Sequence, residues 1–306
     1  MKHPAKRAPD LASPRQQRNW DWRAAANFIA GGAGGGLLLC TSIAGLQTGA
    51  IRMALLSGLV LIASGLTCVW FEIGRPWRAI NVYRHFTASW MTREAFVALA
   101  LFAAGGWALI GVQPLVVALT GLLGLVFLYS QARMLAANKG IPAWRHPRCI
   151  PLMIGSSLAE GAGVLVCVAA IASAVIGFPA LAGLIALIAA RALLWKFYLR
   201  GLIADGAPQA AIKVLRAIER KLLLWGHLAP ALLVVAAMAD VPGQPGLMLA
   251  AGIMTVAGGW ALKFNLVRRA GFTQGIALAR LPVRDRAAAG PATQAGWTAI
   301  PRSKTG

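Results

Sequence analysis

The sequence predicts an all-α, polytopic membrane protein made of eight transmembrane helices. Of its 306 residues, 58% are hydrophobic and only 13% are charged, and the mean hydropathy is +0.66. Soluble domains of this length are much less apolar. The apolar residues also gather in eight runs of about 20 residues, which is the length that crosses a bilayer core. We therefore expect a membrane-embedded helical bundle rather than a soluble domain.

The eight predicted spans form a membrane domain over residues 24–270. A basic arm with three prolines, residues 1–23, precedes it, and a tail rich in Pro, Ala and Arg, residues 271–306, follows it. The first span is longer than a signal-peptide core and lacks a cleavage site, so we expect it to be retained. Its glycines between positions 31 and 36 predict close helix packing. The predicted spans are 24–46, 51–71, 95–112, 114–135, 150–176, 179–199, 222–238 and 246–267.

An amphipathic helix is predicted between the sixth and seventh spans. Asp205 can cap its N-terminus, and Pro208 suits its first turn. Apolar and basic residues then alternate at helical spacing. They are Ile212, Leu215 and Ile218 on one face and Lys213, Arg216 and Arg220 on the other. This pattern is typical of a helix that lies in the membrane surface.

The distribution of positive charge predicts the topology. The chain has 30 Lys and Arg against 9 Asp and Glu, for a net charge of +21. Every Lys and Arg except Arg52 falls on or beside the connections of one side, and the connections of the other side are short. Positive segments stay in the cytoplasm, so both termini and the loop after the second span should be cytoplasmic. The high positive charge is thus explained by the topology and not by a nucleic-acid partner, and we expect no such partner.

The cysteines and histidines argue against a bound metal centre. Cys40, Cys68, Cys149 and Cys167 have no C-x-x-C spacing, so they do not predict an iron–sulfur cluster. A bis-histidine haem needs ligands on facing helices, and of the four histidines only His227 falls within a predicted span. We expect no haem and no iron–sulfur cluster in this chain.

The densest polar chemistry lies in residues 71–96, FEIGRPWRAINVYRHFTASWMTREAF, between the second and third spans. This stretch resembles the membrane anchor subunits of molybdenum oxidoreductases of the dimethyl sulfoxide reductase type, the DmsC and NrfD group. Residues 140–151 and 271–283 look most like the subgroup named for phenylacetyl-CoA:acceptor oxidoreductases. The matching motif residues are Gly74, Pro76, Arg78, Ala79, Asn81, Ser89, Trp90, Arg93 and Glu94.

The resemblance implies a quinone-reactive subunit, using menaquinone or ubiquinone, in the bacterial inner membrane. Such a subunit exchanges electrons with an iron–sulfur subunit that serves a molybdopterin catalytic subunit, and it does not itself act on the soluble substrate. Both partners would dock on the basic cytoplasmic face, whereas the partners of some anchors face the periplasm. Glu72 stands where the bacterial dimethyl sulfoxide reductase anchor has a histidine, which argues against a histidine-based route for protons.

Oxidation of a quinol releases two protons and two electrons, so a quinol site needs hydrogen-bond acceptors and an apolar slot. The candidate acceptors are Glu94, Glu72 and His85. In the competing interpretation the arginines only set the topology, and the two glutamates only pair with them. The candidate quinone-binding residues are Arg75, Arg78, Asn81, Ser89, Trp90 and Arg93.

Two further charges lie inside predicted spans. Glu160 and Arg191 are about ten and nine residues from the cytoplasmic ends of the fifth and sixth spans, so they should lie at matching depth. Charges in lipid are paired or line water, which predicts a contact between them. Such a pair serves packing or proton transfer, and it is the basis of the alternative function, a secondary transporter.

Overall fold

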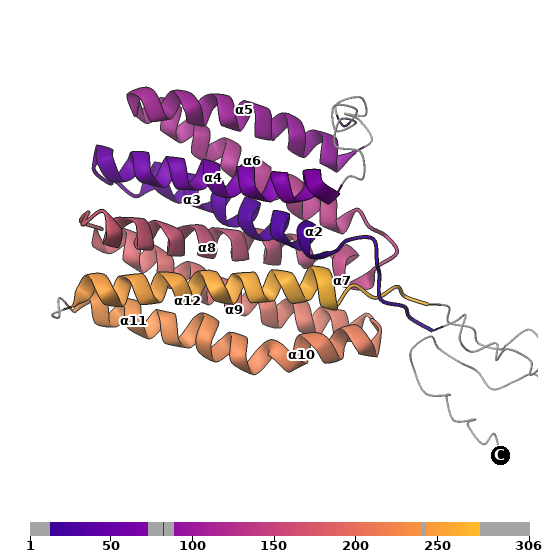
Figure 1. The fold of residues 1–306 in the computed structure, drawn as a ribbon. Helices are drawn as coiled ribbons and strands as arrows, with labels where there is room; N and C mark the ends of the chain where they lie inside the picture. Colours follow the sequence, from indigo (N-terminus) through magenta and orange to yellow (C-terminus); the bar gives the residue numbers. More distant parts are fainter. Residues whose placement is uncertain (1–12, 73–81, 83–88, 240–242, 276–306) are drawn as a thin grey trace, which may run out of the picture.

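The computed structural model describes residues 13–72, 82, 89–239 and 243–275, and the regular structure of this part of the chain is helical (Figure 1). Eight of its helices are long and apolar enough to cross a membrane, as predicted, and they define a multi-pass membrane protein. The first four spans are α2 (Trp22–Ala26) with the π-helical turn η1 (Asn27–Gly31) and α3 (Gly32–Ile43), then α4 (Thr48–Glu72), α5 (Trp90–Gly111) and α6 (Pro114–Ala136). After the short α7 (Pro142–Arg145) come α8 (Cys149–Ile171), α9 (Phe178–Ala204), α10 (Gln209–Leu223) with η3 (Leu224–Leu228) and α11 (Ala229–Met238), and α12 (Gln244–Phe264) with η4 (Asn265–Arg269).

Polar caps explain why some spans begin outside their apolar runs. Asp21 caps α2, where its side chain accepts a hydrogen bond from the backbone N–H of Arg23 at 2.7 Å. Ser89 caps α5 and accepts from the backbone N–H of Thr92 at 3.4 Å. An oxygen at the N-cap satisfies a backbone donor that the helix leaves free. The third span therefore starts at Trp90, five residues before the predicted start, and includes Glu94 in its second turn.

The predicted surface helix before the seventh span is not a separate element. Gln209–Met238 form one continuous helical run through η3. The N-cap is Pro208, not Asp205, which instead ends α9 and lies 3.3 Å from the His146 ring. The amphipathic pattern itself is confirmed, because Ile212 and Leu215 are buried and Ile218 is half-buried, while Lys213, Arg216 and Arg220 are exposed. The pattern predicted the faces of the helix but could not reveal that no break separates it from the apolar run.

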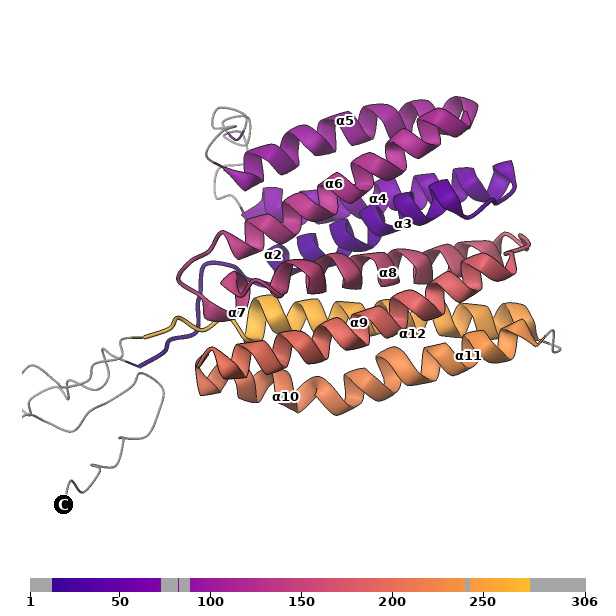
Figure 2. The same ribbon diagram turned by 180° about the vertical axis from the view of Figure 1, so that it is seen from behind.

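The first and fifth spans occupy the centre of the bundle. Figures 1 and 2 show α4, α5 and α6 on one side of this centre and α9, α12 and α10–α11 on the other. The helix α3 packs against α4, α6 and α8, and α8 packs in turn against α12. The central spans are the most buried because helices surround them on both sides.

Glycines of α3 allow this close packing, as predicted. A Cβ on Gly34 would lie 2.6 Å from the carbonyl oxygen of Gly58 in α4. A Cβ on Gly36 would lie 2.1 Å from the Ser157 carbonyl oxygen in α8, and one on Gly124 of α6 would lie 2.7 Å from the Gly35 carbonyl oxygen. Successive residues of a helix point about 100° apart, so consecutive glycines serve three neighbouring helices.

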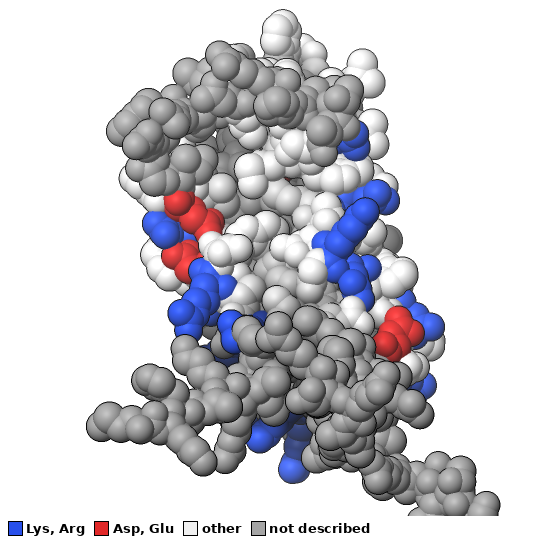
Figure 3. Space-filling model, turned by 90° about the vertical axis from the view of Figure 1, so that its right-hand side faces the viewer, with Lys and Arg blue, Asp and Glu red and all other residues white. Residues whose placement is uncertain are grey.

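The termini of the membrane domain meet at one end of the bundle. The arm and the tail were predicted as separate segments, but the Gln17 backbone N–H donates to the Gly271 carbonyl at 2.8 Å, and Thr273 N–H donates to the Arg15 carbonyl at 2.8 Å. Trp20 stacks on Trp144 at 4.9 Å between ring centroids. Figure 3 shows Lys and Arg side chains around this end. It is also the end at which α4 ends and α5 begins, and we refer to it as the loop-bearing end.

Candidate functional site

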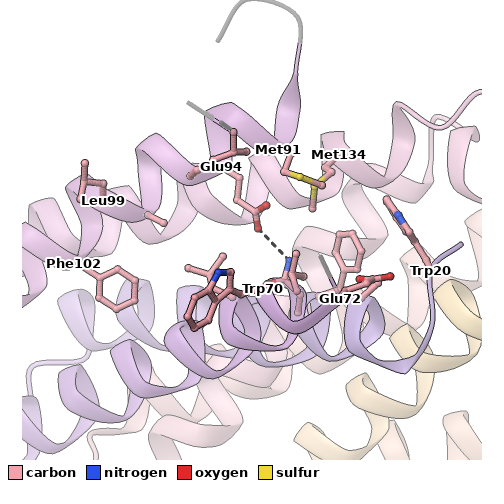
Figure 4. Close-up of a pocket in the computed structure, with 16 residues that line it drawn as sticks. Trp20, Trp70, Glu72, Met91, Glu94, Leu99, Phe102 and Met134 are labelled. Atoms are coloured by element: carbon pink, nitrogen blue, oxygen red, sulfur yellow. Dashed lines mark hydrogen bonds between the residues drawn. The ribbon is translucent and has the colours of Figure 1, made fainter. Parts of the chain in front are cut away.

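A cavity of about 390 Å³ lies among the first four spans at this loop-bearing end (Figure 4). Its walls are mainly apolar, and two carboxylates, Glu72 and Glu94, are its only acidic lining residues among those the structure describes. Trp20 and Glu72 lie toward one end of it, and Leu99 and Phe102 lie toward the other. The lining residues are Trp20, Ala24, Asn27, Phe28, Leu66, Val69, Trp70, Glu72, Val82, Met91, Glu94, Ala95, Ala98, Leu99, Phe102 and Met134.

The cavity reaches the apolar side of the bundle between α4 and α5. Two of its lining side chains are largely exposed there, Trp70 at 46% and Leu99 at 60%. In a membrane this surface faces hydrocarbon, since water-facing surfaces carry polar side chains. From Glu94 to Phe102 the wall of α5 extends about 12 Å at 1.5 Å per residue. The cavity therefore offers a lipophilic molecule a sideways entrance and an apolar slot.

Glu94 is buried and bonded only to neutral groups among the described residues. Its side chain is 3% exposed. Its Oε1 accepts from Asn27 Nδ2 at 3.4 Å and from Gln131 Nε2 at 3.1 Å. The ion pairs of the described chain do not include Glu94. A carboxyl group without a fixed cation can exchange a proton with a ligand more readily than an ion-paired one can.

Asn27, in the same site, has a side-chain oxygen that lacks a hydrogen-bond partner among the described residues. Its backbone carbonyl accepts from Gln131 Nε2 at 3.2 Å, but its buried Oδ1 has no hydrogen-bond partner in the described structure. Such buried acceptors are rare, because an unmade hydrogen bond costs about 1–3 kcal/mol. Gly65 provides the space, since a Cβ there would lie 3.2 Å from Asn27 Oδ1. The side chain of Asn27 thus donates to Glu94, and its Oδ1 lies against Gly65 without a hydrogen-bond partner among the described residues.

Glu72 lies at the end of the cavity near the start of the first span. Arg23 donates to the carbonyl of the preceding residue, Phe71, at 2.7 Å, and it also pairs with Asp21 at 2.8 Å. The hydrogen bond from Arg23 holds the pKa of Asp21 below its usual value. Figure 4 shows the Glu94 carboxyl group between the two ends of the cavity, with Glu72 on the Trp20 side of it.

The remaining predicted site residues divide into two groups. His85, Arg75, Arg78 and Asn81 lie outside the described residues. Ser89 caps α5, and neither it nor Trp90 nor Arg93 lines the cavity. The Trp90 ring instead lies 4.4 Å from the Arg93 guanidinium and 4.8 Å from that of Arg133. These three residues lie outside the cavity around Glu94, and their assignment to quinone binding stays a prediction.

Glu160 and Arg191 form no direct ion pair among the described residues, although both side chains are completely buried and each affects the other electrostatically. Glu160 pairs with Lys263 at 2.9 Å and accepts from Ser156 at 2.8 Å. Arg191 donates to His227 Nε2 at 3.1 Å and to the Thr255 carbonyl at 2.8 Å. It also donates to the Gly226 carbonyl, in the π-helical turn η3. The depth argument placed both charges in the core but could not tell which faces they occupy.

Sequence reasoning missed Asn27, Gln131 and Lys263. Each is a polar residue inside a span, which by itself is a signal, because such side chains face the interior of a bundle and bond there. His227 lies in the same core and donates through Nδ1 to the Leu222 carbonyl at 2.8 Å. Among the described residues, no three His, Cys, Asp or Glu side chains are grouped so that they could hold a metal ion.

Fold and site together define a multi-pass helical membrane protein with a mainly apolar cavity that holds two carboxyl groups. No protein-family model matches this chain, and no characterised protein matches it in a sequence comparison. The function must therefore be argued from the site itself.

Proposed function

We propose that this chain is the membrane anchor and quinone-reactive subunit of a multi-subunit molybdopterin oxidoreductase of the bacterial inner membrane, similar to the DmsC and NrfD group. The observation that carries the proposal is the cavity around Glu94, which combines an apolar slot, a lateral entrance and two buried oxygen acceptors. A quinol needs these features, because its ring and tail are apolar and its hydroxyl groups donate hydrogen bonds.

The chain's own residues have distinct roles in this proposal. Oxidation of a quinol supplies two protons and two electrons. Glu94 accepts a proton from one hydroxyl group, while Asn27 Oδ1 orients the ligand by accepting a hydrogen bond. Gln131 holds the Glu94 carboxyl in place. Glu72 passes protons to the surface at the loop-bearing end. Electrons leave to an iron–sulfur partner that docks at that end.

The transporter alternative has less support. It depends on the intramembrane charges Glu160 and Arg191, and these are held by Lys263 and His227 in the packed core. Purification distinguishes the two functions, because an anchor brings down a cysteine-rich iron–sulfur protein and a molybdoprotein, whereas a transporter purifies without them.

Metal analysis and an optical spectrum of the separated subunit test whether this chain holds a redox metal of its own. A stoichiometric haem band, or iron that remains after the partner is removed, contradicts the proposal.

The decisive experiment replaces Glu94 by Gln in the assembled complex. Loss of a general base lowers rates by about 10²–10⁴-fold, so quinol-linked turnover should fall by at least 100-fold while insertion and assembly persist. Glu72→Gln should have a weaker or equal effect. The matched control is Asp205→Asn, which removes an exposed carboxylate at the same end of the bundle and outside the cavity. Wild-type quinol-linked rates in both glutamate variants would exclude the assignment.

The proposed orientation places the loop-bearing end in the cytoplasm. Nearly all positive charge gathers there, and an acidic patch on the iron–sulfur subunit would complement it. A cysteine introduced in the tail, at residues 276–306, should resist an impermeant thiol reagent in intact cells, and one at positions 47–50 should react. Reaction at the tail in intact cells would show that the chain has the opposite orientation.

A further inference from the structure

The exposed face of the long helical run Gln209–Met238 changes abruptly from basic to apolar. The exposed side chains of its first part are mainly cationic, and those of its second part are all apolar. The basic set is Lys213, Arg216, Arg220 and Lys221. The apolar set is Leu224, Trp225, Leu228, Leu232 and Val235, which are between 41% and 64% exposed. Only two residues separate the last basic residue from the first apolar one.

This change marks the level at which the hydrocarbon of the membrane begins. Charged side chains are excluded from the hydrocarbon core, and Trp is enriched at its boundary. Trp225 is 64% exposed just after the last exposed cation, Lys221. The basic part of α10 therefore lies at the level of the lipid headgroups, and the same face continues into the acyl chains.

The basic face of α10 points away from the bundle. Its opposite face is buried through Ala211, Ile212 and Leu215, and α10–α11 form an outer edge of the molecule in both ribbon views (Figures 1 and 2). Two shallow, open depressions lie along this edge, and Arg216 lines both. The other cations in them are Lys213 in the first and Arg220 in the second, where Glu219 is the one acidic lining residue described.

We propose that the outer face of α10 is a binding site for anionic phospholipid. Lys213, Arg216 and Arg220 contact the headgroup phosphate, and the acyl chains lie along Leu224 and Leu228. The three cations fall at positions i, i+3 and i+7 of one helix and so span about 10 Å along one face. Arginine binds phosphate through two parallel N–H groups, and clustered cations at a membrane surface attract anionic lipid.

A lipid fits this surface better than a protein partner does. The cations are continuous with a lipid-facing apolar stripe on the same helix, so one amphipathic ligand satisfies both parts. A soluble partner would cover the basic part and leave the stripe to the membrane. The inference depends only on the multi-pass fold and not on the quinone proposal.

Native mass spectrometry of the purified full chain tests the site. The chain is titrated with phosphatidylglycerol and, separately, with phosphatidylcholine of the same acyl chains. We expect phosphatidylglycerol to bind more tightly, and Arg216→Gln/Arg220→Gln to weaken it by about tenfold or more. Arg216→Lys/Arg220→Lys, which keeps the charges, should retain most of the affinity and shows that the surface still folds.

The matched control removes two charges elsewhere. Arg18→Gln/Lys139→Gln replaces two exposed cations outside α10 and should change phosphatidylglycerol affinity by less than about twofold. The proposal is overturned if the α10 variant binds phosphatidylglycerol like wild type, if the control loses as much affinity, or if phosphatidylcholine binds equally well. It is also overturned if the α10 variant loses only a co-purifying protein.

Discussion

Two buried carboxylates, Glu94 in the first half of the bundle and Glu160 in the second, have opposite surroundings. Glu94 is held by the neutral amides of Asn27 and Gln131 and faces a cavity. Glu160 is completely buried, and its bonds go to a serine hydroxyl and to the Lys263 ammonium group. A glycine at position 259 leaves space for it, since a Cβ there would lie 2.3 Å from Glu160 Oε1.

The difference shows how the same residue type serves two purposes inside a membrane. In a buried ion pair the carboxylate stays deprotonated and the ammonium group stays protonated, because neutralising either one leaves the other as an uncompensated charge. A carboxyl group bonded to amides keeps both protonation states accessible, since the amides do not impose a full charge. Glu160 and Lys263 thus suit a structural role, whereas Glu94 suits chemistry. The variants below test this contrast, from the largest expected effect to the smallest.

Replacement of Lys263 by Met should be the most damaging change. It leaves Glu160 buried without its cation, and breaking a buried pair in this way costs about 3–5 kcal/mol. Chemical unfolding of the purified chain in mixed micelles measures the loss. Glu94→Gln, measured in the same way, should cost about 1 kcal/mol or less, because a neutral amide replaces a carboxyl held by hydrogen bonds.

A double variant serves as the control for this effect. Glu160→Gln/Lys263→Met removes both charges, so it should recover part of the stability that Lys263→Met loses. If Lys263→Met proves as stable as wild type, the pair is not structural and the contrast with Glu94 fails.

Replacing a glycine beside each site by alanine should destabilise the chain to different extents at the two sites. Gly259→Ala places a Cβ against Glu160 and should destabilise the chain by about 1–3 kcal/mol, the usual cost of overpacking. Gly65→Ala meets Asn27 and the Gly31 backbone at 3.0–3.2 Å, so it should disturb the cavity with a smaller loss of stability. Unfolding measurements on both variants give the comparison. An equal loss in both would mean that the two sites are packed equally tightly.

A pH dependence outside the spans should give the smallest effect. Burial holds the pKa of His146 below its usual value, although the Asp205 carboxylate favours the charged form. The unfolded chain then binds the proton more readily, so the free energy of unfolding should decrease as pH falls below about 6.5. A pH series of unfolding measurements on His146→Gln should lack this slope. A slope that persists in the variant arises from another group.

The composition and the apolar runs predicted the fold class and eight spans, because hydrocarbon requires long apolar helices with internal backbone hydrogen bonds. The motif also identified Glu94 and Glu72, since carboxylates beside a span are unusual enough to attract notice. The motif could not show that Trp90 and Arg93 face away from the cavity, because a shift of one residue along a helix turns a side chain by about 100°.

Only the tertiary structure decided which polar residues meet. Glu94 bonds to residues 67 positions earlier and 37 positions later, and Glu160 bonds to a lysine 103 positions away. Whether such distant side chains meet depends on how each helix is rotated and on which spans are neighbours. Glycines such as Gly34 and Gly36 help to decide both by allowing close helix contact. The sequence by itself determined which eight segments are apolar and long enough to span a membrane. Packing determined that Glu94 faces a cavity while Glu160 faces Lys263, because only packing brings distant side chains within bonding distance.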